Sequence, residues 1–419
     1  MANDIRDLIV VGGGASGMLT GLLAARRGLS VSILEHGKTL GKKLAVTGNG
    51  KCNFTNLYQE KSCYNSGDIE KAYNIIDKLG GKGLIDLFSS FGIEGTVKKG
   101  RNFDRIEAGY VYPAGESAKE FVNILNDELI RLKVKLKTNI NILDIKKKGE
   151  LFEIITGTEG NFYSYFAKKL VIACGGLAGA STGSDGSLFD IIKRLGHSII
   201  KPLPALTSVK TGKHDFGGLR CVAEIKAYID KKGEQILLGS EVGELQFTEQ
   251  GIGGIPVMQL SGKIAREIDK GNKLYFYIDF CYDKSGAELE NILKKRRELL
   301  SERAADKFLT GLTYEKLSKY IADKFLDNKN KVENITDNKI NMILKWLKEA
   351  KFDIITVNGF DSAQTTSGGV SMDEVTHSLE SKLVSGLFFA GEVLDVDGLC
   401  GGYNLTWAFA SAYEVGNGG

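Results

Sequence analysis

The sequence predicts an α/β fold of the Rossmann type, and three features in the first 35 residues indicate it. An apolar strand at residues 7–11 runs directly into the pattern Gly12-x-Gly14-x-x-Gly17. A helix is expected over residues 15–27, and Gly28 is a natural C-terminal stop for it. A second strand, residues 29–34, leads to Glu35, which follows Gly17 by 18 residues. The glycine pattern alone is weak in a chain with 52 glycines, but strand, helix and acid together favour a βαβ unit that binds a dinucleotide.

Each glycine of this pattern has a distinct expected task. Gly12 allows the tight turn after the strand, Gly14 lets the backbone approach a pyrophosphate, and Gly17 lets the helix pack closely on the strand. The pyrophosphate is then expected at the N–H groups that begin the helix, where the helix dipole favours negative charge. The Glu35 carboxylate is placed to accept both ribose hydroxyls of an adenosine.

A second cofactor element near the carboxyl terminus separates flavin from nicotinamide dinucleotides. An apolar strand, residues 383–389, leads into Ala390-Gly391-Glu392, and a glycine-rich turn then opens the apolar stretch 405–412. The Glu392 carboxylate can bond a ribityl hydroxyl, and the start of the last helix can face the N1–C2 edge of a flavin. A nicotinamide cofactor has no ribityl chain, so the sequence predicts FAD, bound non-covalently.

Two further segments are expected at the cofactor. Residues 41–56 are too polar and too rich in glycine for a buried strand or a helix interior, so this loop is predicted to lie over the cofactor. The segment Gly175-Gly-Leu-Ala-Gly179 follows a strand but lacks the spacing of a second dinucleotide fingerprint, and it is expected to return the chain to FAD. Without a second fingerprint, NAD(P)H as an electron donor would bind transiently at the face that binds substrate, and oxygen is the other electron partner.

Composition excludes several classes of function. The net charge of +3 is small, and the sequence has no basic stripe interleaved with aromatic residues, so we expect no binding to nucleic acid. We expect no membrane span, no signal peptide and a cytoplasmic protein. The six cysteines and four histidines follow no metal-ligand spacing, so no metal is predicted, and the histidines are expected at the surface or in loops. The lysines at 146–148 are expected to form a solvated hairpin turn.

The predicted FAD-binding domain is discontinuous, residues 1–190 and 352–419. Residues 191–351 are predicted to form an inserted substrate domain: a β unit over 200–281 and about 330–351, and a helical subdomain over about 283–327. Within this insertion, extended, turn-punctuated segments precede Cys281, and helical periodicity follows it, including residues 302–309. The substrate is expected between the flavin face and the inserted domain.

Motifs distributed over the whole chain resemble those of the BaiN-like flavoproteins, also called the aminoacetone-oxidase family. They are Gly-Gly-Gly-Ala-Ser-Gly, Gly41 to Asn56, Cys174-Gly-Gly, Ser181 to Gly186, Leu245 to Pro256, Thr366 to Ser371 and Gly391 to Asn404. The resemblance implies a glutathione-reductase-like FAD domain with an inserted β-barrel-like domain that carries a helical subdomain. The stretch Gln246-Phe-Thr-Glu-Gln-Gly departs from the family pattern, because the family's histidine and serine are absent here.

Family members are assigned two activities, so both stay open: NAD(P)H-dependent reduction of an enone of steroid or bile-acid type, and oxidation by oxygen of a small amine such as aminoacetone. A flavin-dependent enzyme acting on RNA, and a flavin-binding protein without catalysis, are the alternatives from other classes. The candidates for catalysis are Tyr403, Asn404, Cys400 and Asp395, in the turn expected to face the flavin. The predicted cofactor-binding residues are Gly12, Gly14, Ala15, Ser16, Gly17, Glu35, His36, Lys42, Lys43, Thr47, Gly48, Asn49, Gly50, Asn53, Ile142, Gly175, Gly391, Glu392, Gly401, Gly402, Tyr403 and Asn404.

Overall fold

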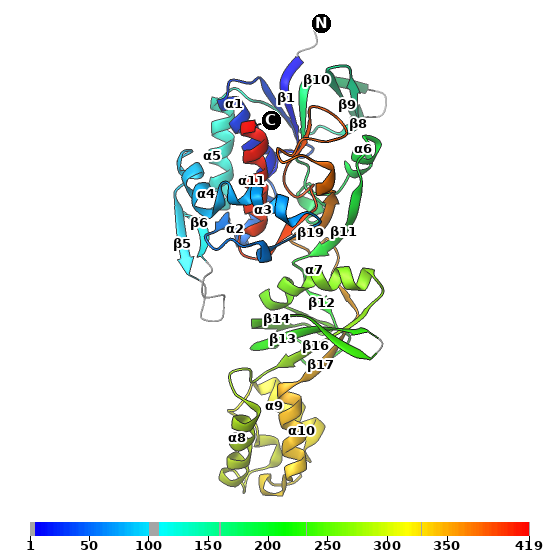
Figure 1. The fold of residues 1–419 in the computed structure, drawn as a ribbon. Helices are drawn as coiled ribbons and strands as arrows, with labels where there is room; N and C mark the ends of the chain where they lie inside the picture. Colours follow the sequence, from blue (N-terminus) through cyan, green and yellow to red (C-terminus); the bar gives the residue numbers. More distant parts are fainter. Residues whose placement is uncertain (1–4, 100–108, 159–160, 232, 328, 419) are drawn as a thin grey trace. The chain divides into compact units, whose positions relative to one another are not determined.

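The chain divides into two compact units in the computed structural model, which describes residues 5–99, 109–158, 161–231, 233–327 and 329–418 (Figure 1). The first unit holds residues up to 205 together with 360–419, and the second holds residues 206–359. The predicted boundaries lay at 190/191 and 351/352. The structure keeps residues 191–205 in the first unit because β11 (Ile199–Ala205) pairs with β19 (Thr365–Val370). It keeps residues 352–359 in the second because β17 (Ala350–Ile354) pairs with β16 (Lys273–Asp279).

The first unit is built on a seven-stranded sheet with a parallel centre, so the predicted α/β fold is confirmed. The order is β7 (Lys135–Lys137), β2 (Val31–Leu34), β1 (Ile5–Val11), β10 (Asn161–Ile172), β9 (Leu151–Thr158) and β8 (Ile142–Lys148), and β20 (Leu387–Phe389) also pairs with β10. β1 runs parallel to both β2 and β10, whereas β8, β9 and the first half of β10 form an antiparallel meander. The run Leu8–Val11 is apolar and buried, as expected of a strand covered on both faces.

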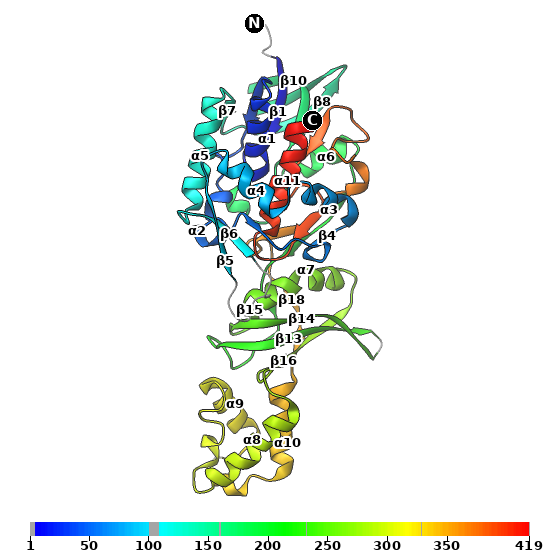
Figure 2. The same ribbon diagram turned by 60° about the vertical axis from the view of Figure 1, so that its left-hand side comes forward.

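Helices α1 (Ala15–Arg26), α5 (Ala118–Arg131) and α11 (Tyr403–Gly418) lie side by side and cover this sheet (Figures 1 and 2). α11 approaches α1 so closely that a Cβ on Gly416 would lie 2.8 Å from the Cβ of Leu23. α5 begins where the Ser117 side chain accepts the Glu120 N–H, and α3 begins in the same way at Asp68. This packing brings the amino-terminal βαβ unit and the last helix of the chain into one core.

The elements of the first unit are β1 (Ile5–Val11), α1 (Ala15–Arg26), β2 (Val31–Leu34), α2 (Thr47–Gly50), β3 (Thr55–Asn56), β4 (Tyr64–Ser66), α3 (Ile69–Asp77), α4 (Gly80–Ser89), β5 (Gly95–Lys99), β6 (Gly109–Pro113), α5 (Ala118–Arg131), β7 (Lys135–Lys137), β8 (Ile142–Lys148), β9 (Leu151–Thr158), β10 (Asn161–Ile172), α6 (Phe189–Arg194), β11, β19, β20 (Leu387–Phe389), β21 (Val396–Gly398) and α11 (Tyr403–Gly418).

The second unit is a seven-stranded sheet of order β17-β16-β13-β14-β15-β12-β18, with its own core. β17 and β18 (Thr356–Val357) are consecutive in the chain yet stand at opposite ends of this order. One stretch of chain therefore joins the two ends of the sheet, as a barrel-like closure requires. α7, whose first turn carries Pro256, packs on this sheet. The remaining elements are β12 (Val209–Lys210), β13 (Arg220–Lys231), β14 (Glu234–Phe247), β15 (Gly251–Gly253), α7 (Ile255–Asp269), α8 (Gly286–Leu299), α9 (Glu315–Phe325) and α10 (Asp337–Lys348).

The structure corrects three details of the sequence prediction and adds a fourth. Residues 330–351 were assigned to the β unit, but most of them form α10, which the Thr336 side chain caps. Residues 302–309 contain only the short 3₁₀ turn Ala305–Lys307. The lysines at 146–148 end strand β8, and the turn follows at Gly149. His197 lies in a loop, as expected, but it is buried there: Nδ1 lies 2.9 Å from Glu374 Oε2, and Nε2 lies 2.8 Å from Ser381 Oγ.

Candidate functional site

The turn between β1 and α1 is shaped around its three fingerprint glycines. Gly12 has φ +101°, a conformation that side chains disfavour, and a Cβ there would overlap the Ala173 carbonyl. A Cβ on Gly17 would overlap the Gly12 carbonyl oxygen, so the helix can pack this closely only with glycine. A Cβ on Gly14 would instead meet no described atom within 4 Å. Open space therefore lies over Gly14, at the position predicted for the pyrophosphate.

The amino end of α1 is available to an anion. Gly14 is its N-cap residue, no side chain from the described residues caps it, and its first turn holds no acid. Ala15 and Ser16 form that first turn, and Ser16 is buried. The first N–H groups of a helix have no partner within the helix, so this end can bond a phosphate group directly.

Glu35 lies beside this turn, as the fingerprint predicts. Its Oε2 accepts the Gly13 N–H and its Oε1 accepts the Gly37 N–H, each at 2.6 Å. An ionised carboxylate has about four acceptor positions, so both oxygens can also accept hydroxyl groups. The neighbouring His36 is exposed, and Ile142 begins β8 two residues after Ile140, whose N–H donates to the Glu35 carbonyl oxygen at 2.9 Å. The geometry fits the ribose of an adenosine.

Replacing Glu35 with alanine is expected to weaken FAD binding about ten- to hundredfold, the range for losing hydrogen bonds to a charged group. The test is a titration of apoprotein with FAD, followed by flavin fluorescence. Glu60, an exposed acid in the same unit, supplies the control variant Glu60→Ala. An unchanged affinity in Glu35→Ala would remove Glu35 from the site.

Two of the three lysines in the loop at 41–56, Lys42 and Lys43, anchor it to other segments. Lys42 Nζ donates to the Ser181 carbonyl oxygen at 2.6 Å, and Lys43 Nζ lies 2.7 Å from Glu392 Oε2. Gly48 and Asn49 have left-handed backbone conformations and are exposed, as is Gly50. Thr47 Oγ1 donates to the Leu44 carbonyl oxygen at 2.7 Å, and the Asn53 amide, oriented to satisfy its hydrogen bonds, donates to the Thr55 and Val111 carbonyls. The lysines thus join this loop to two distant segments of the chain.

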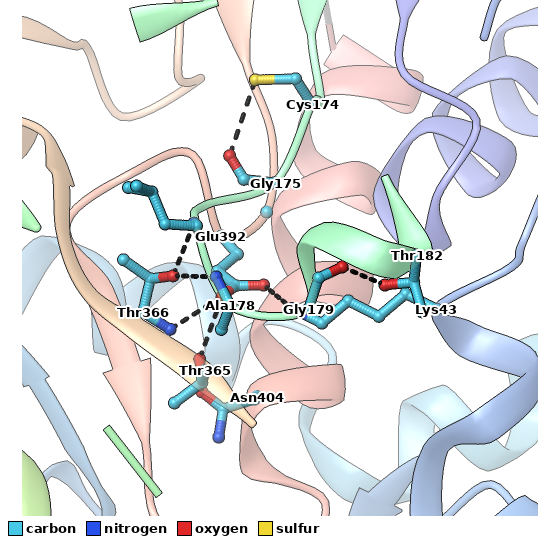
Figure 3. A network of polar contacts seen from close by, with 12 residues as sticks. Lys43, Cys174, Gly175, Ala178, Gly179, Thr182, Thr365, Thr366, Glu392 and Asn404 are labelled. Atoms are coloured by element: carbon cyan, nitrogen blue, oxygen red, sulfur yellow. Dashed lines mark hydrogen bonds and ion pairs between the residues drawn. The ribbon is translucent and has the colours of Figure 1, made fainter. Parts of the chain in front are cut away.

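Glu392 joins three segments of the site, as Figure 3 shows. Besides Lys43, it bonds β19, because Oε1 accepts the Thr366 N–H at 2.8 Å. Thr366 Oγ1 in turn accepts the N–H groups of Leu177 and Ala178, at 2.8 and 3.0 Å. Gly175 opens this segment, with φ +77°. The sequence assigned Glu392 to the cofactor but placed Thr366 only in a motif. The polar run Thr365-Thr366-Ser367, which is buried in β19, was a usable signal.

A double-mutant cycle on Lys43 and Glu392 tests whether this ion pair organises the site. We expect Lys43→Met and Glu392→Gln each to weaken FAD binding. The double variant should lose less than the sum, by about 0.5–3 kcal/mol, because the two side chains act as a unit. Lys78 and Glu414 form an ion pair of the same 2.7 Å length elsewhere in this unit, and Lys78→Met is the control. Additive losses in affinity would show that the pair does not act as a unit.

The turn before α11 is closed by Asn404, whose Oδ1 accepts the Gly398 N–H and whose Nδ2 donates to the Gly398 carbonyl, both at 2.8 Å. Tyr403 is buried, with its ring edge-on to Tyr64 at 5.6 Å. Asp395 is buried and accepts the Gly67 N–H at 3.1 Å, while Cys400 is half-buried. A Cβ on Gly391 would overlap the Ser16 side chain, so this region contacts the start of α1. Gly401 and Gly402 have φ values of +124° and +98°.

These features together fit FAD. An open, uncapped helix end, space above Gly14 and a carboxylate at the ribose position lie in one unit with the Glu392 network and the turn that opens α11. Within the described ranges, no three His, Cys, Asp or Glu residues gather as a metal site would require. Nor does any described helix have the length and apolar character needed to span a membrane.

Comparison with known proteins identifies a family and relatives that match nearly the whole chain. The family described as "HI0933-like protein Rossmann domain" matches residues 6–418. A 3-dehydro-bile acid delta(4,6)-reductase from Clostridium scindens is 34% identical, with 97% of each chain covered. A ribosomal RNA dihydrouridine synthase from Escherichia coli is 26% identical, with 97% of this chain and 96% of that protein covered.

Among solved structures, a 3-ketosteroid-delta4-(5alpha)-dehydrogenase from Rhodococcus jostii matches with 16% identity and a TM-score of 0.48, over 100% of this chain and 97% of that one. The family model and the bile-acid reductase each match almost the whole sequence. This chain therefore belongs to the HI0933-like family of Rossmann-fold proteins and is an FAD-dependent oxidoreductase.

Proposed function

We propose that this protein is a reductase that saturates a carbon–carbon double bond conjugated to a carbonyl group, in a small substrate of steroid or bile-acid type. The observation that carries the proposal is the 34% identity, across 97% of both chains, to a 3-dehydro-bile acid delta(4,6)-reductase. The second relative, a ribosomal RNA dihydrouridine synthase, supports the same reaction class. Forming dihydrouridine also saturates a double bond conjugated to a carbonyl.

Charge favours the small molecule over RNA. Binding an RNA backbone draws on a surplus of Lys and Arg, and this chain carries 55 Lys and Arg against 52 Asp and Glu. NAD(P)H is the proposed electron donor, and it would bind transiently because the sequence holds one dinucleotide fingerprint.

The chain's own residues bind and orient, and the cofactor carries the redox chemistry. When bound, FAD accepts and donates hydride at N5. The start of α1 and Glu35 would hold the pyrophosphate and the adenosine ribose. Glu392, fixed by Lys43 and Thr366, would bond the ribityl chain. The amino end of α11 would stabilise negative charge that develops on the flavin pyrimidine edge.

The first expected result is that purified protein contains FAD that heat or acid releases intact. FMN lacks the adenosine that Glu35 addresses, so chromatography of the released flavin should show FAD and no FMN. Flavin that stays with the denatured chain would contradict non-covalent binding, and FMN would contradict the assigned roles of α1 and Glu35.

The reaction itself is tested anaerobically. Protein reduced by NADH or NADPH is mixed with a 4-en-3-one steroid, with uridine-containing ribosomal RNA, or with oxygen, and flavin absorbance at 450 nm reports reoxidation. The proposal expects rapid reoxidation by the steroid. Reoxidation by RNA alone would assign the second relative's activity instead. Reduction of the oxidised protein by aminoacetone, with fast reoxidation by oxygen alone, would assign an amine oxidase.

A further inference from the structure

Two tyrosines on strand β6 share one face of a small sheet beside the cofactor loop. β6 lies between β3 and β5, and β3 is the end of the loop at 41–56. Side chains alternate along a strand, so Tyr110 and Tyr112 point to the same side, about 7 Å apart along the strand. Both are half-buried, whereas Val111 between them is fully buried. The two rings are therefore the large side chains of β6 that stay partly exposed.

Each ring lies against a segment predicted to contact FAD. A Cβ on Gly401 would lie 2.7 Å from Tyr110 Cε1, so this ring lies directly on the turn before α11. A Cβ on Gly48 would lie 3.7 Å from Tyr112 Cε1, so the second ring lies against the cofactor loop. The pair consequently spans from the loop to the turn.

Polar contacts hold β6 in this position. The Asn56 side chain accepts the Gly109 N–H and donates to the Gly401 carbonyl oxygen, both at 3.0 Å, which ties the start of β6 to the turn. Glu116 forms ion pairs with Lys51 of the loop, at 2.6 Å, and with Lys98 of β5. Glu116 has φ +49°, a strained conformation for a residue with a side chain. Lys98 Nζ also lies 5.4 Å from the centre of the Tyr112 ring.

We propose that Tyr110 is the proton donor of the reduction and that Tyr112 contacts the same substrate; this assignment rests on the proposed function. Saturating a conjugated double bond requires one hydride and one proton. The hydride, with both electrons, is added to the β-carbon and comes from the reduced cofactor. The proton is added at the α-carbon or carbonyl oxygen and leaves the Tyr110 hydroxyl, and water then reprotonates the phenolate. Tyr110 takes this role because its ring lies at the turn, while Tyr112 lies between the loop and Lys98.

The test compares Tyr110→Phe and Tyr112→Ala with Tyr165→Phe, which removes the hydroxyl of a half-buried tyrosine on β10 of the central sheet. FAD-loaded proteins are reduced anaerobically with dithionite and mixed with a 4-en-3-one steroid over a range of pH, in H₂O and in D₂O. Steroid binding to the oxidised proteins is measured separately by equilibrium dialysis.

Tyr110→Phe should retain FAD and steroid binding but be reoxidised about 10²–10⁴-fold more slowly, the usual contribution of a general acid, with a changed pH profile and solvent isotope effect. Tyr112→Ala should bind steroid at least tenfold more weakly, and Tyr165→Phe should match the parent. If the steroid reoxidises the parent, and Tyr110→Phe is reoxidised equally fast or lacks FAD, the assignment of Tyr110 is overturned while the proposed function stands. A parent that no enone reoxidises overturns the proposed function and the assignment with it.

Discussion

Replacing Gly14 with alanine is expected to weaken FAD binding strongly while the protein still folds. Gly14 has an ordinary extended conformation, with φ −78°, and a Cβ there would meet no described atom within 4 Å. The folded chain therefore tolerates the methyl group. That space is where the pyrophosphate must approach the start of α1, so the methyl group should weaken FAD binding at least about hundredfold, equivalent to one or two hydrogen bonds to a charged group.

Gly17→Ala provides the opposite case in the same helix. Here the added Cβ would overlap the Gly12 carbonyl oxygen and lie 3.3 Å from Val10 Cγ1, so α1 must move away from β1. We expect this variant to unfold at a lower temperature or to fail to accumulate, since overpacking a tight interior contact costs about 1–3 kcal/mol or more. Thermal unfolding of the two apoproteins, and FAD titration of each, separate the two effects.

The two variants are expected to lose different properties: Gly14→Ala its FAD affinity, and Gly17→Ala its stability. A Gly14→Ala protein with the parent's FAD affinity would show that the cofactor does not approach α1. A Gly17→Ala protein with the parent's stability would show that the helix can shift without cost. Gly28→Ala is an unsuitable control, because Gly28 has φ +87° and is strained with any side chain. Gly286→Ala, in open space at the start of α8, is the matched variant.

The sequence was sufficient to predict strands and helices wherever the signal for them was local. The apolar run before Gly12, the spacing to Glu35 and the strand before Gly391 each occupy one short stretch, and β1, α1, β2 and β20 are found there. The resemblance of motifs along the chain also predicted a β insertion with helices, and the second unit contains both. Local patterns of this kind depend on backbone propensity and on burial of one element, which a single sequence records.

Pairings between distant segments could not be predicted from the sequence. Nothing in the sequence near Lys43 indicates that its ammonium group bonds Glu392, 349 residues away, or that Thr366 bonds both Glu392 and the segment after β10. His197 was expected at the surface or in a loop, and it lies in a loop. Its burial depends on Glu374 and Ser381, which bond its two ring nitrogens. Burial lowers the pKa of His197, although Glu374 opposes the shift. Such partners are known only once the chain is folded.

The turn before α11 is where we expect reactivity to be lost before binding. Gly402 has φ +98°, and a Cβ there would lie 2.6 Å from the Thr55 carbonyl oxygen. Its own carbonyl accepts the Thr406 N–H at 2.8 Å, which begins the hydrogen bonding of α11. Gly402→Ala must therefore displace the turn from β3 and re-aim the first N–H groups of the helix. The adenosine and pyrophosphate are assigned to α1 and Glu35, so much of the FAD affinity should remain.

The expected result is a lower midpoint potential and at least tenfold slower flavin reduction in FAD-loaded Gly402→Ala. Losing one preorganised donor to a developing negative charge costs about 2.7–4 kcal/mol in other enzymes. Gly418→Ala, in the last turn of the same helix, adds a Cβ that meets nothing within 4 Å of described structure and serves as the control. Potentiometry and stopped-flow reduction measure both quantities, and FAD content with circular dichroism reports whether the variant is folded. A folded, FAD-loaded variant with the parent's potential and rate would mean that this turn does not face the flavin, because moving its N–H groups would then have no effect on the charge that reduction adds to the pyrimidine edge.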